Sequence, residues 1–467
     1  MLNVVLLVVD SLRACALEAD DELGRPRTPF LDRLGRESVS FSRAYATECW
    51  TLPTHGSIFT GLLPSEHGAH FQTMQYANAA PTIAELLADA GYHTEVITRN
   101  SIFDGGIPGI TRGFRRATTV LSSRSGVNPL SVMLALSKPR FRRQIMSSGF
   151  FSAAQRANRE FVTRFARATV PADRDALAVV LQRMEVFRRE RRPYFLFCNL
   201  YDVHAPYPPA EHSIFRPLRR LASWPETLRM PVVLPKLGGH RYLQRGFRLS
   251  PASRRLLLGR YHRAIELMDA KLADFYAAAD ASGHLRDTLF VVMSDHGEAF
   301  GEHGLYLHDA SVYDVHLRVP LFVQHPRVHP ERVADVVSTR DVFGLLRSAA
   351  SMAPPIGTLL DPDYRAAHPI AIAEHFYYPH VPNVRPDFAR DLVTAIAGDH
   401  KIVAQRSGAT LYDLARDRHE VRGEPGPAEH FAARCRADGV SGEAISGAFT
   451  HLTRFVAARG TCLGLAA

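Results

Sequence analysis

Three short apolar runs in this chain are followed by aspartate or histidine residues, which are side chain types able to bind metals or charged groups. Residues 2–9 lead into Asp10, residues 193–200 lead towards His204, and residues 289–294 lead into Asp295. Runs of this length without polar alternation are typical of strands buried on both faces of a mostly parallel sheet. Such sheets place their ligands at the carboxyl ends of the strands. We therefore predict an α/β fold with a site at that edge.

The residues between these runs support a parallel sheet. Residues 81–92 have apolar side chains at helical spacing and are stopped by Gly91, and residues 93–98 then follow as a strand. This β-α-β order favours a mostly parallel sheet flanked by helices. Asn100 follows that strand, so it either reaches the site or serves only as a turn residue. Residues 393–396, 401–403 and 411–414 are typical of short antiparallel strands.

Residues 48–61 predict a loop that carries a hydroxyl nucleophile and runs into a helix. Pro53 suits the first turn of a helix, and Gly61 suits its end. Thr51 therefore lies close to a helix N-terminus, where free N–H groups favour a phosphate or sulfate group. A threonine hydroxyl is a poor nucleophile unless a metal or base lowers its pKa. An ordinary N-capping threonine is the alternative interpretation.

The residues after the last strong strand supply candidate metal ligands. Asp295 and His296 are adjacent, and both reach one ion if the strand end bends. A carboxylate with an imidazole suits zinc or manganese as well as magnesium.

Several of these motifs resemble those of the sulfatases in the alkaline phosphatase superfamily. Residues 294–304 match the pattern Ser-Asp-His-Gly-Glu-x-x-Gly-Glu-His-Gly, and residues 60–68 match Thr-Gly-x-x-Pro-x-x-His-Gly. Pro53 aligns the signature Cys/Ser-x-Pro-x-Arg so that Thr51, and not Cys49, stands at the nucleophile position. Threonine cannot become formylglycine, so the resemblance is to the Thr-nucleophile branch.

The chain departs from the sulfatase pattern at two further positions. His55 stands where sulfatases have arginine, and Ser11 replaces the second of two aspartates that bind calcium in many sulfatases. The resemblance implies one divalent ion (Mn, Zn, Mg or Ca) bound by Asp10, Thr51, Asp295 and His296. It also implies that His55, His204 and His308 act in catalysis and substrate binding, with Asn100 as a further substrate-binding residue.

The same resemblance divides the chain into two parts. Residues 1–350 are expected to form the sulfatase-like catalytic domain, with basic helical insertions at about 121–192 and 211–263. Residues 351–467 are expected to form a small C-terminal α+β subdomain with a short antiparallel sheet and a terminal helix. The insertions are either solvated basic faces or an electrostatic guide for an anionic substrate.

The expected activity is hydrolysis or transfer of a phosphate ester through a covalent phospho-Thr51 intermediate. Two alternatives stay open. One is a sulfuric ester hydrolase that works without formylglycine, and the other is a non-catalytic binding protein on the same scaffold. A non-catalytic protein would be expected to have lost ligands, whereas Asp10, Thr51, Asp295 and His296 are all present.

Composition limits the partners and the location. The net charge of +9 favours an anionic small-molecule ester, and no nucleic-acid-binding pattern occurs in the basic segments. No run approaches the roughly 18 apolar residues of a membrane span. Five cysteines at irregular spacing indicate reduced thiols and a cytoplasmic protein. The sequence does not indicate an oligomeric state.

Overall fold

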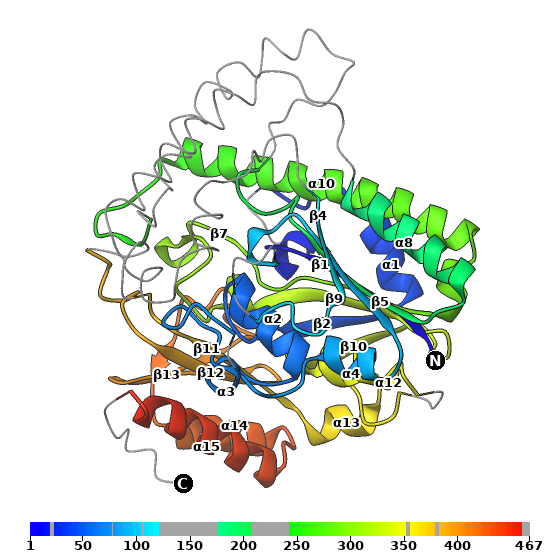
Figure 1. Ribbon diagram of the computed structural model, residues 1–467. Helices are drawn as coiled ribbons and strands as arrows, with labels where there is room; N and C mark the ends of the chain where they lie inside the picture. The colour runs from blue at the N-terminus through cyan, green and yellow to red at the C-terminus, as the bar shows by residue number, and fades with distance from the viewer. Residues whose placement is uncertain are drawn as a thin grey trace.

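The structure is a computed structural model, and it describes residues 1–18, 23–76, 78–103, 107, 109–120, 175–207, 242–351, 355–378 and 383–459. A large mixed sheet lies at its centre (Figure 1). The strand order in this eight-stranded sheet is β10 (Glu331–Ser338), β2 (Val39–Tyr45), β9 (Arg318–Gln324), β6 (Thr288–Met293), β1 (Asn3–Val9), β5 (Tyr194–Leu200), β3 (His93–Thr98) and β4 (Arg116–Thr119).

The three apolar runs form the middle of this sheet. β1 pairs in parallel with β5 on one side and with β6 on the other. All residues of β5 and β6 are buried, as are residues 4–9 of β1. β9 pairs antiparallel with both β2 and β6. The predicted α/β fold with a mostly parallel central sheet is therefore confirmed.

Helices cover both faces of the sheet (Figure 1). One layer contains α1 (Pro29–Glu37), α8 (Ala176–Glu190) and the long α10 (Pro251–Ala281). The other contains α2 (Thr51–Thr60), α4 (Ile83–Asp89) and α12 (Val342–Ser348), and α3 (Pro64–His67) follows α2. Short elements complete this part. They are the helices α11 (Asp314–Leu317) and α13 (Pro362–Ala367), the hairpin of β7 (Ala299–Phe300) and β8 (Tyr306–Leu307), and the 3-10 turns η1 (Ala14–Leu17), η2 (Ser101–Phe103), η4 (His284–Asp287), η5 (Glu302–Gly304) and η6 (Thr339–Asp341).

The C-terminal part is a small antiparallel sheet covered by two helices. Its order is β11 (Ile370–His375), β12 (Leu392–Ala397), β13 (His400–Gln405), β14 (Gly408–Asp413) and β15 (Glu424–Pro425). α14 (Ala428–Ala437) and α15 (Gly442–Ala457) pack on it and enclose a separate apolar cluster that includes Ile402, Phe431 and Phe455. This is the expected α+β subdomain.

The expected basic insertions lie mostly outside the described residues, in 121–174 and 208–241. Their remaining parts belong to the helical layer of the main sheet. α8 buries Leu177, Val180 and Met184 and packs on β5 and β3. Residues 251–263 are the first turns of α10, whose buried positions include Leu257 and Tyr261. The predicted insertions therefore included helix residues that pack on the main sheet. The basic side chains on the outer faces of these helices made the buried apolar faces hard to recognise in the sequence.

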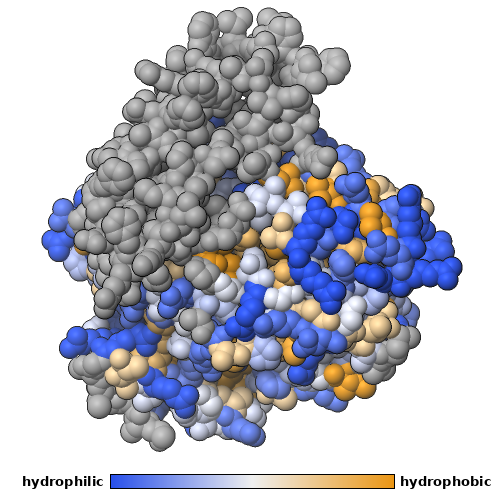
Figure 2. Space-filling model, in the orientation of Figure 1, coloured by the Kyte–Doolittle hydropathy of each residue, from blue (hydrophilic) through white to orange (hydrophobic). Residues whose placement is uncertain are grey.

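The visible surface of the described residues is mainly hydrophilic, with apolar side chains in small groups (Figure 2). Large exposed apolar side chains include Met1, Leu23, Ile356 and Val421, which lie far apart in the sequence. Within the described ranges, no helix has the length and apolar character needed to cross a membrane.

Candidate active site

The ends of β1 and β6 bring two carboxylates together. These strands pair in parallel up to Val8 and Met293, and Asp10 and Asp295 each follow two residues later. The Ser294 hydroxyl fixes the strand ends by donating a hydrogen bond to the carbonyl of Val9 (2.7 Å). Both aspartates are fully buried. The structure thus places the two predicted acidic ligands side by side at the carboxyl edge of the sheet.

Ser11 links the two carboxylates. Its hydroxyl donates to Asp10 Oδ1 (3.0 Å), and its backbone N–H donates to Asp295 Oδ1 (3.2 Å). Its φ of 67° is in the left-handed region, which is unfavourable for a non-glycine residue and is found at functional sites. A neutral donor therefore occupies the position where many sulfatases carry a second aspartate.

Thr51 is the first residue of α2 and faces this cluster. Its Oγ1 lies 3.5 Å from Asp10 Oδ2 and 3.4 Å from His296 Nε2. The helix runs from Thr51 to Thr60 and ends at Gly61, whose φ of 73° suits the left-handed cap. The preceding Trp50 stacks on Phe71 with ring centroids 4.0 Å apart, which anchors the start of the helix. The Thr51 hydroxyl is therefore held at a helix N-terminus, beside the Asp10 carboxylate and the His296 imidazole that were predicted to bind the metal.

The residues at this point fit a divalent cation. Ligand atoms of Asp10, Asp295 and His296 lie within 4.8 Å of one another. Asp295 Oδ2 is buried and has no hydrogen-bond partner among the described residues. Burial and the charge of Asp10 raise the pKa of Asp295 to about 7. A bound cation would remove this repulsion and would give the unpaired oxygen a partner.

His296 has the form that a metal ligand requires. Its Nδ1 donates to the carbonyl of Gly297 (2.9 Å), which leaves Nε2 free to face the two carboxylates. Nε2 lies 3.4 Å from Asp295 Oδ2 and 3.7 Å from Asp10 Oδ1. Burial lowers the pKa of His296, so the ring is neutral. A hydrogen bond on the far nitrogen orients many metal-binding histidines in this way.

Two amide side chains hold Asp10 from the neighbouring strands. Asn100, after β3, donates to Asp10 Oδ2 (3.2 Å), and Asn199, on β5, donates to the same oxygen (3.3 Å). Asn100 was expected to bind substrate, but its amide contacts a predicted metal ligand. Asn199 was missed by sequence reasoning. The available signal was its amide group, which interrupts the apolar run of β5.

His55 is near the cluster but is enclosed by aromatic rings. Its Nδ1 donates to the carbonyl of Thr51 (2.8 Å) and lies 3.8 Å from Asp295 Oδ2. Its ring packs edge-on against Phe103, Phe197 and Phe59. Burial lowers the pKa of His55 to about 4, so the ring is neutral. It therefore lacks the positive charge that arginine supplies at this position in sulfatases.

His204 and His308 close the site on its more accessible side. Their ring centroids are 5.1 Å apart, and the ring of His308 is 4.4 Å from that of His296. His204 is half-buried and stacks on Tyr201, and His308 is 13% exposed. His204 and His308 were both proposed as site residues from the sequence, and the fold brings their rings together although they lie 104 positions apart in the chain.

Glu298 determines the charge of His308. Its Oε1 lies 3.1 Å from His308 Nδ1, and the Glu298 side chain is fully buried. Burial acts to lower the pKa of His308, but Glu298 and Asp309 raise it to about 10. The imidazole is therefore protonated at neutral pH. Glu298 directly precedes β7 and His308 directly follows β8, so the β7–β8 hairpin brings the two side chains together.

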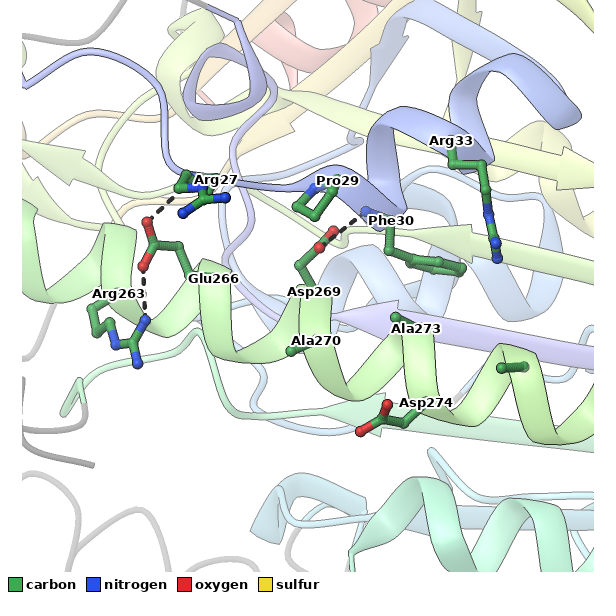
Figure 3. Close-up of a pocket in the computed structure, with 11 residues that line it drawn as sticks. Arg27, Pro29, Phe30, Arg33, Arg263, Glu266, Asp269, Ala270, Ala273 and Asp274 are labelled. Atoms are coloured by element: carbon green, nitrogen blue, oxygen red, sulfur yellow. Dashed lines mark hydrogen bonds and ion pairs between the residues drawn. The ribbon is translucent and has the colours of Figure 1, made fainter. Parts of the chain in front are cut away.

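A groove of about 590 Å³ between α1 and α10 lies apart from this cluster (Figure 3). None of the site residues lines it. Its Glu266 carboxylate accepts hydrogen bonds from Arg27 N and Arg263 Nη1, and its Asp269 carboxylate accepts from the backbone N–H groups of Phe30 and Leu31. These acids hold the start of α1 and belong to the fold.

The same arrangement of sheets is found in solved structures of hydrolases. The phosphonate monoester hydrolase of Agrobacterium radiobacter has the same fold, with a TM-score of 0.62 and 18% identity over 97% of this chain and 96% of that chain. The family model described as Sulfatase matches residues 2–351, so the chain belongs to the Sulfatase family. It is an ester hydrolase of that family.

Curated relatives are distant in sequence. The choline-sulfatase of Rhizobium meliloti (strain 1021) is 24% identical over 363 residues, which are 75% of this chain and 68% of the relative. The multifunctional alkaline phosphatase superfamily protein PehA of Trinickia caryophylli is 24% identical over 339 residues, which are 65% of this chain and 64% of the relative. The chain thus spans about two thirds of the length of these relatives.

Proposed function

We propose that the chain is a metal-dependent hydrolase or transferase of phosphate esters in which Thr51 is the nucleophile. The observation that carries this proposal is the position of Thr51 Oγ1, 3.5 Å from Asp10 and 3.4 Å from His296 at the N-terminus of α2. A hydroxyl there meets an anionic group bound by the free N–H groups of the helix. Threonine at this position also excludes the formylglycine route.

One divalent ion, Mn, Zn, Mg or Ca, fits the carboxylates of Asp10 and Asp295, the imidazole of His296 and the hydroxyl of Thr51. When bound, such an ion lowers the pKa of a neighbouring hydroxyl and offsets negative charge on a transferring phosphoryl group. Asn100, Asn199 and Ser11 orient Asp10 through its two oxygens.

In the proposed first step, Thr51 Oγ1 forms a bond to phosphorus while the bond from phosphorus to the leaving oxygen breaks. The hydroxyl proton passes along its hydrogen bond to Asp10 Oδ2. His308 donates the proton on Nε2 to the leaving oxygen, because its Nδ1 is held by Glu298. The product of this step is phospho-Thr51.

In the second step, water or an acceptor alcohol forms a bond to phosphorus and displaces Thr51. His308, unprotonated after the first step, takes the proton of the attacking hydroxyl, and the Asp10 proton returns to Thr51. His204 binds oxygens of the transferring group from the more accessible side. His55 remains neutral and holds the carbonyl of Thr51, which fixes the first turn of α2.

A trapping experiment tests the nucleophile. Metal-loaded protein turning over an aryl phosphate is quenched with acid, and its peptides are analysed by mass spectrometry. We expect one phosphoryl group on Thr51, and we expect Thr51→Ala to lose turnover by at least about 10³-fold while still binding metal. Thr450→Ala removes an exposed hydroxyl from α15 in the C-terminal subdomain and serves as the control. Near wild-type turnover of metal-loaded Thr51→Ala would refute the proposal.

Sulfate ester hydrolysis is the second candidate, and the similarity to choline-sulfatase favours it. Metal-depleted protein is assayed on matched aryl phosphate and sulfate esters after addition of Mn, Zn, Mg or Ca. A preference for phosphate supports phosphoryl transfer by Thr51. A preference for sulfate supports direct sulfuryl transfer by Thr51, or a nucleophile other than Thr51, which makes Cys49 the next residue to test for modification.

The substrate is proposed to be a small anionic ester. For location, we infer the cytoplasm from the odd number of cysteines, and Cys15, Cys49, Cys198 and Cys435 carry free thiols among the described residues.

A further inference from the structure

A second group of metal-binding side chain types lies outside the candidate active site. Glu48 and Cys49 are in the loop between β2 and α2, and His375 is the last residue of β11. Ligand atoms of the three residues lie within 4.8 Å of one another, and all three side chains are buried. This Glu48–Cys49–His375 cluster takes no part in the steps described for Thr51.

The distances within the cluster resemble those of a tetrahedral site. Glu48 Oε1 lies 3.1 Å from Cys49 Sγ and 2.9 Å from His375 Nδ1, and Sγ lies 3.6 Å from Nδ1. In a zinc site the ion is about 2.3 Å from sulfur and about 2.0 Å from nitrogen or oxygen, which separates the ligand atoms by about 3.3–3.6 Å. Shifts of a few tenths of an ångström would therefore admit the ion.

Hydrogen bonding within the cluster is uneven. Glu48 Oε1 accepts from the Cys49 N–H (3.1 Å) and faces both the thiol and the imidazole, whereas Glu48 Oε2 has no partner among the described residues. His375 Nε2 also has none. An unpaired oxygen on a fully buried carboxylate is unfavourable. A cation bound by the carboxylate would supply the missing interaction.

We propose that Glu48, Cys49 and His375 form a second metal site that selects zinc or a similar cation. A thiolate, an imidazole and a carboxylate suit zinc, whereas magnesium and calcium prefer oxygen ligands. One dication balances the negative charges of the Glu48 carboxylate and the Cys49 thiolate. Three protein ligands leave one coordination position for water. Because the cluster is buried, the ion is acquired during folding or local opening.

The position of the cluster indicates a structural role for this ion. It joins the C-terminal sheet to the loop before α2, in which Cys49 lies two residues before Thr51. The neighbouring residue on β11, Glu374, donates its N–H to the carbonyl of Thr47 (2.8 Å), and its carboxylate accepts from Ser65 beyond α2. The end of β11 therefore contacts the chain on both sides of α2, and the ion would fix the start of that helix.

Cobalt substitution tests this proposal independently of turnover. The chain is produced with cobalt in place of zinc, and its absorption spectrum and metal content are measured. We expect two ions per chain and a thiolate-to-cobalt charge-transfer band. Asp295→Asn should lose the active-site ion but keep the band. Cys49→Ser should lose the band and one ion, and His375→Gln should weaken or abolish the band.

Cys435→Ala is the matched control, since Cys435 is another buried thiol, on α14 in the apolar cluster of the C-terminal subdomain, and it belongs to no group of candidate metal ligands among the described residues. It should keep both the band and the second ion. If Cys49→Ser fails to fold, the Asp295→Asn protein with its native thiols decides the question. Absence of a thiolate band from both the unmodified chain and Asp295→Asn, or no zinc retained by Asp295→Asn, would overturn the second site.

Discussion

Asp10 receives hydrogen bonds from residues on three different segments. Ser11 donates to Oδ1, and Asn100 and Asn199 both donate to Oδ2. Burial acts to raise the pKa of Asp10, but the nearby imidazoles of His204 and His308 help to hold it below its ordinary value. The carboxylate is therefore ionised and oriented before any ligand arrives, and its orientation depends on residues that bind no ion themselves.

Removal of one of these donors should weaken metal binding. We expect Asn199→Ala to reduce the affinity for the activating divalent ion by about 10- to 100-fold, as is typical when a residue that orients a ligand is lost. Competition with a chromophoric chelator measures this affinity. Asn78→Ala, which removes an amide bonded to the carbonyl of Glu66 in a distant turn, should leave it unchanged. Equal affinities for Asn199→Ala and the unmodified chain would contradict this orienting role.

Two buried histidines predict acid sensitivity. His67 donates from Nε2 to the carbonyl of Pro53 and accepts at Nδ1 from Ala69 N–H. His316 donates from Nε2 to the carbonyl of Leu307 and accepts at Nδ1 from the Ser311 hydroxyl. Both rings are satisfied only when neutral, and burial lowers the pKa of each to about 3.

The stability that His67 and His316 contribute is present above pH 6.5, which is about the pKa of histidine in the unfolded chain. It is lost as the pH falls towards 3, because the unfolded chain then binds more protons than the folded one. We expect each of these histidines to reduce the free energy of unfolding by about 1.4 kcal/mol per pH unit below 6.5. Urea unfolding at pH 7, 6 and 5 measures this. His67→Gln should be less stable at pH 7 but should show a shallower pH dependence. A midpoint independent of pH over this range would contradict the prediction.

At the residue scale, the sequence predicted the positions of the strongest ligand candidates but not their neighbours. Asp10, Asp295 and His296 follow apolar strands directly, so the edge they occupy was evident. Asn199 was missed because the side to which a strand residue points depends on the register of β5 with β1, where Asn199 lies opposite Val8. The Glu48–Cys49–His375 cluster was missed because His375 lies 327 positions after Glu48 and 326 after Cys49, and no local pattern links them.

At the scale of single elements, the packing of α2 requires that its residue Gly56 lie very close to the ring of His67. A Cβ atom on Gly56 would lie 2.7 Å from His67 Cε1 and 2.9 Å from its Nε2. The ring cannot move aside freely, because its nitrogens are bonded to Pro53 and Ala69. Glycine is thus required at this helical position by the neighbouring ring and not by its backbone conformation.

We expect Gly56→Ala to lower the free energy of unfolding by about 1–3 kcal/mol, the usual effect of overpacking, and to reduce turnover by displacing Thr51. Gly344→Ala is the matched control, since Gly344 also lies inside a helix, α12, with open space at its Cβ. That variant should be neutral or more stable by up to about 1 kcal/mol. Urea unfolding of the two variants provides the comparison. Equal stability of Gly56→Ala and Gly344→Ala would show that the ring adapts.

Elements with strong local signals were predicted well. Pro53 and Gly61 marked α2, and the three C-terminal strands were recognised from their composition. The strand order of the main sheet was not predicted, nor was the antiparallel direction of β9. Both follow from how the connections cross the sheet, which local patterns do not encode. Parts of the helices α8 and α10 were assigned to the basic insertions, because that prediction rested on the number of basic residues, and these helices carry basic residues on their exposed faces.

At the scale of the whole molecule, a buried lysine joins the two sheets. Lys401 on β13 lies 2.7 Å from Asp314 Oδ1 and 2.6 Å from Glu420 Oε1. Asp314 begins α11, which leads directly into β9 of the main sheet. Burial acts to lower the pKa of Lys401, but the two carboxylates raise it, so the ammonium group stays charged. The attachment of the C-terminal subdomain therefore includes a buried ionic contact.

We expect Lys401→Met to reduce the free energy of unfolding by about 3–5 kcal/mol, because it removes the cation that faces the buried Glu420 carboxylate and the partly buried Asp314 carboxylate. Adding Glu420→Gln should recover part of this loss. Lys271→Met serves as the control, since Lys271 bonds Asp202 at a half-buried site where such pairs contribute at most about 1 kcal/mol. Urea unfolding monitored by tryptophan fluorescence measures all three. A Lys401→Met variant no less stable than Lys271→Met would contradict the prediction.

The matched positions of Asp10 and Asp295, each two residues beyond a paired position of β1 and β6, have a consequence for how this chain can vary. The separation of the two carboxylates follows from main-chain pairing, so exchanging one apolar side chain for another in these strands preserves it. Inserting or deleting a single residue in either strand shifts one carboxylate by about 3.3 Å and turns it to the opposite face of the sheet. The separation of the two carboxylates is therefore insensitive to exchanges between apolar side chains in β1 and β6 and sensitive to any change in the length of these strands.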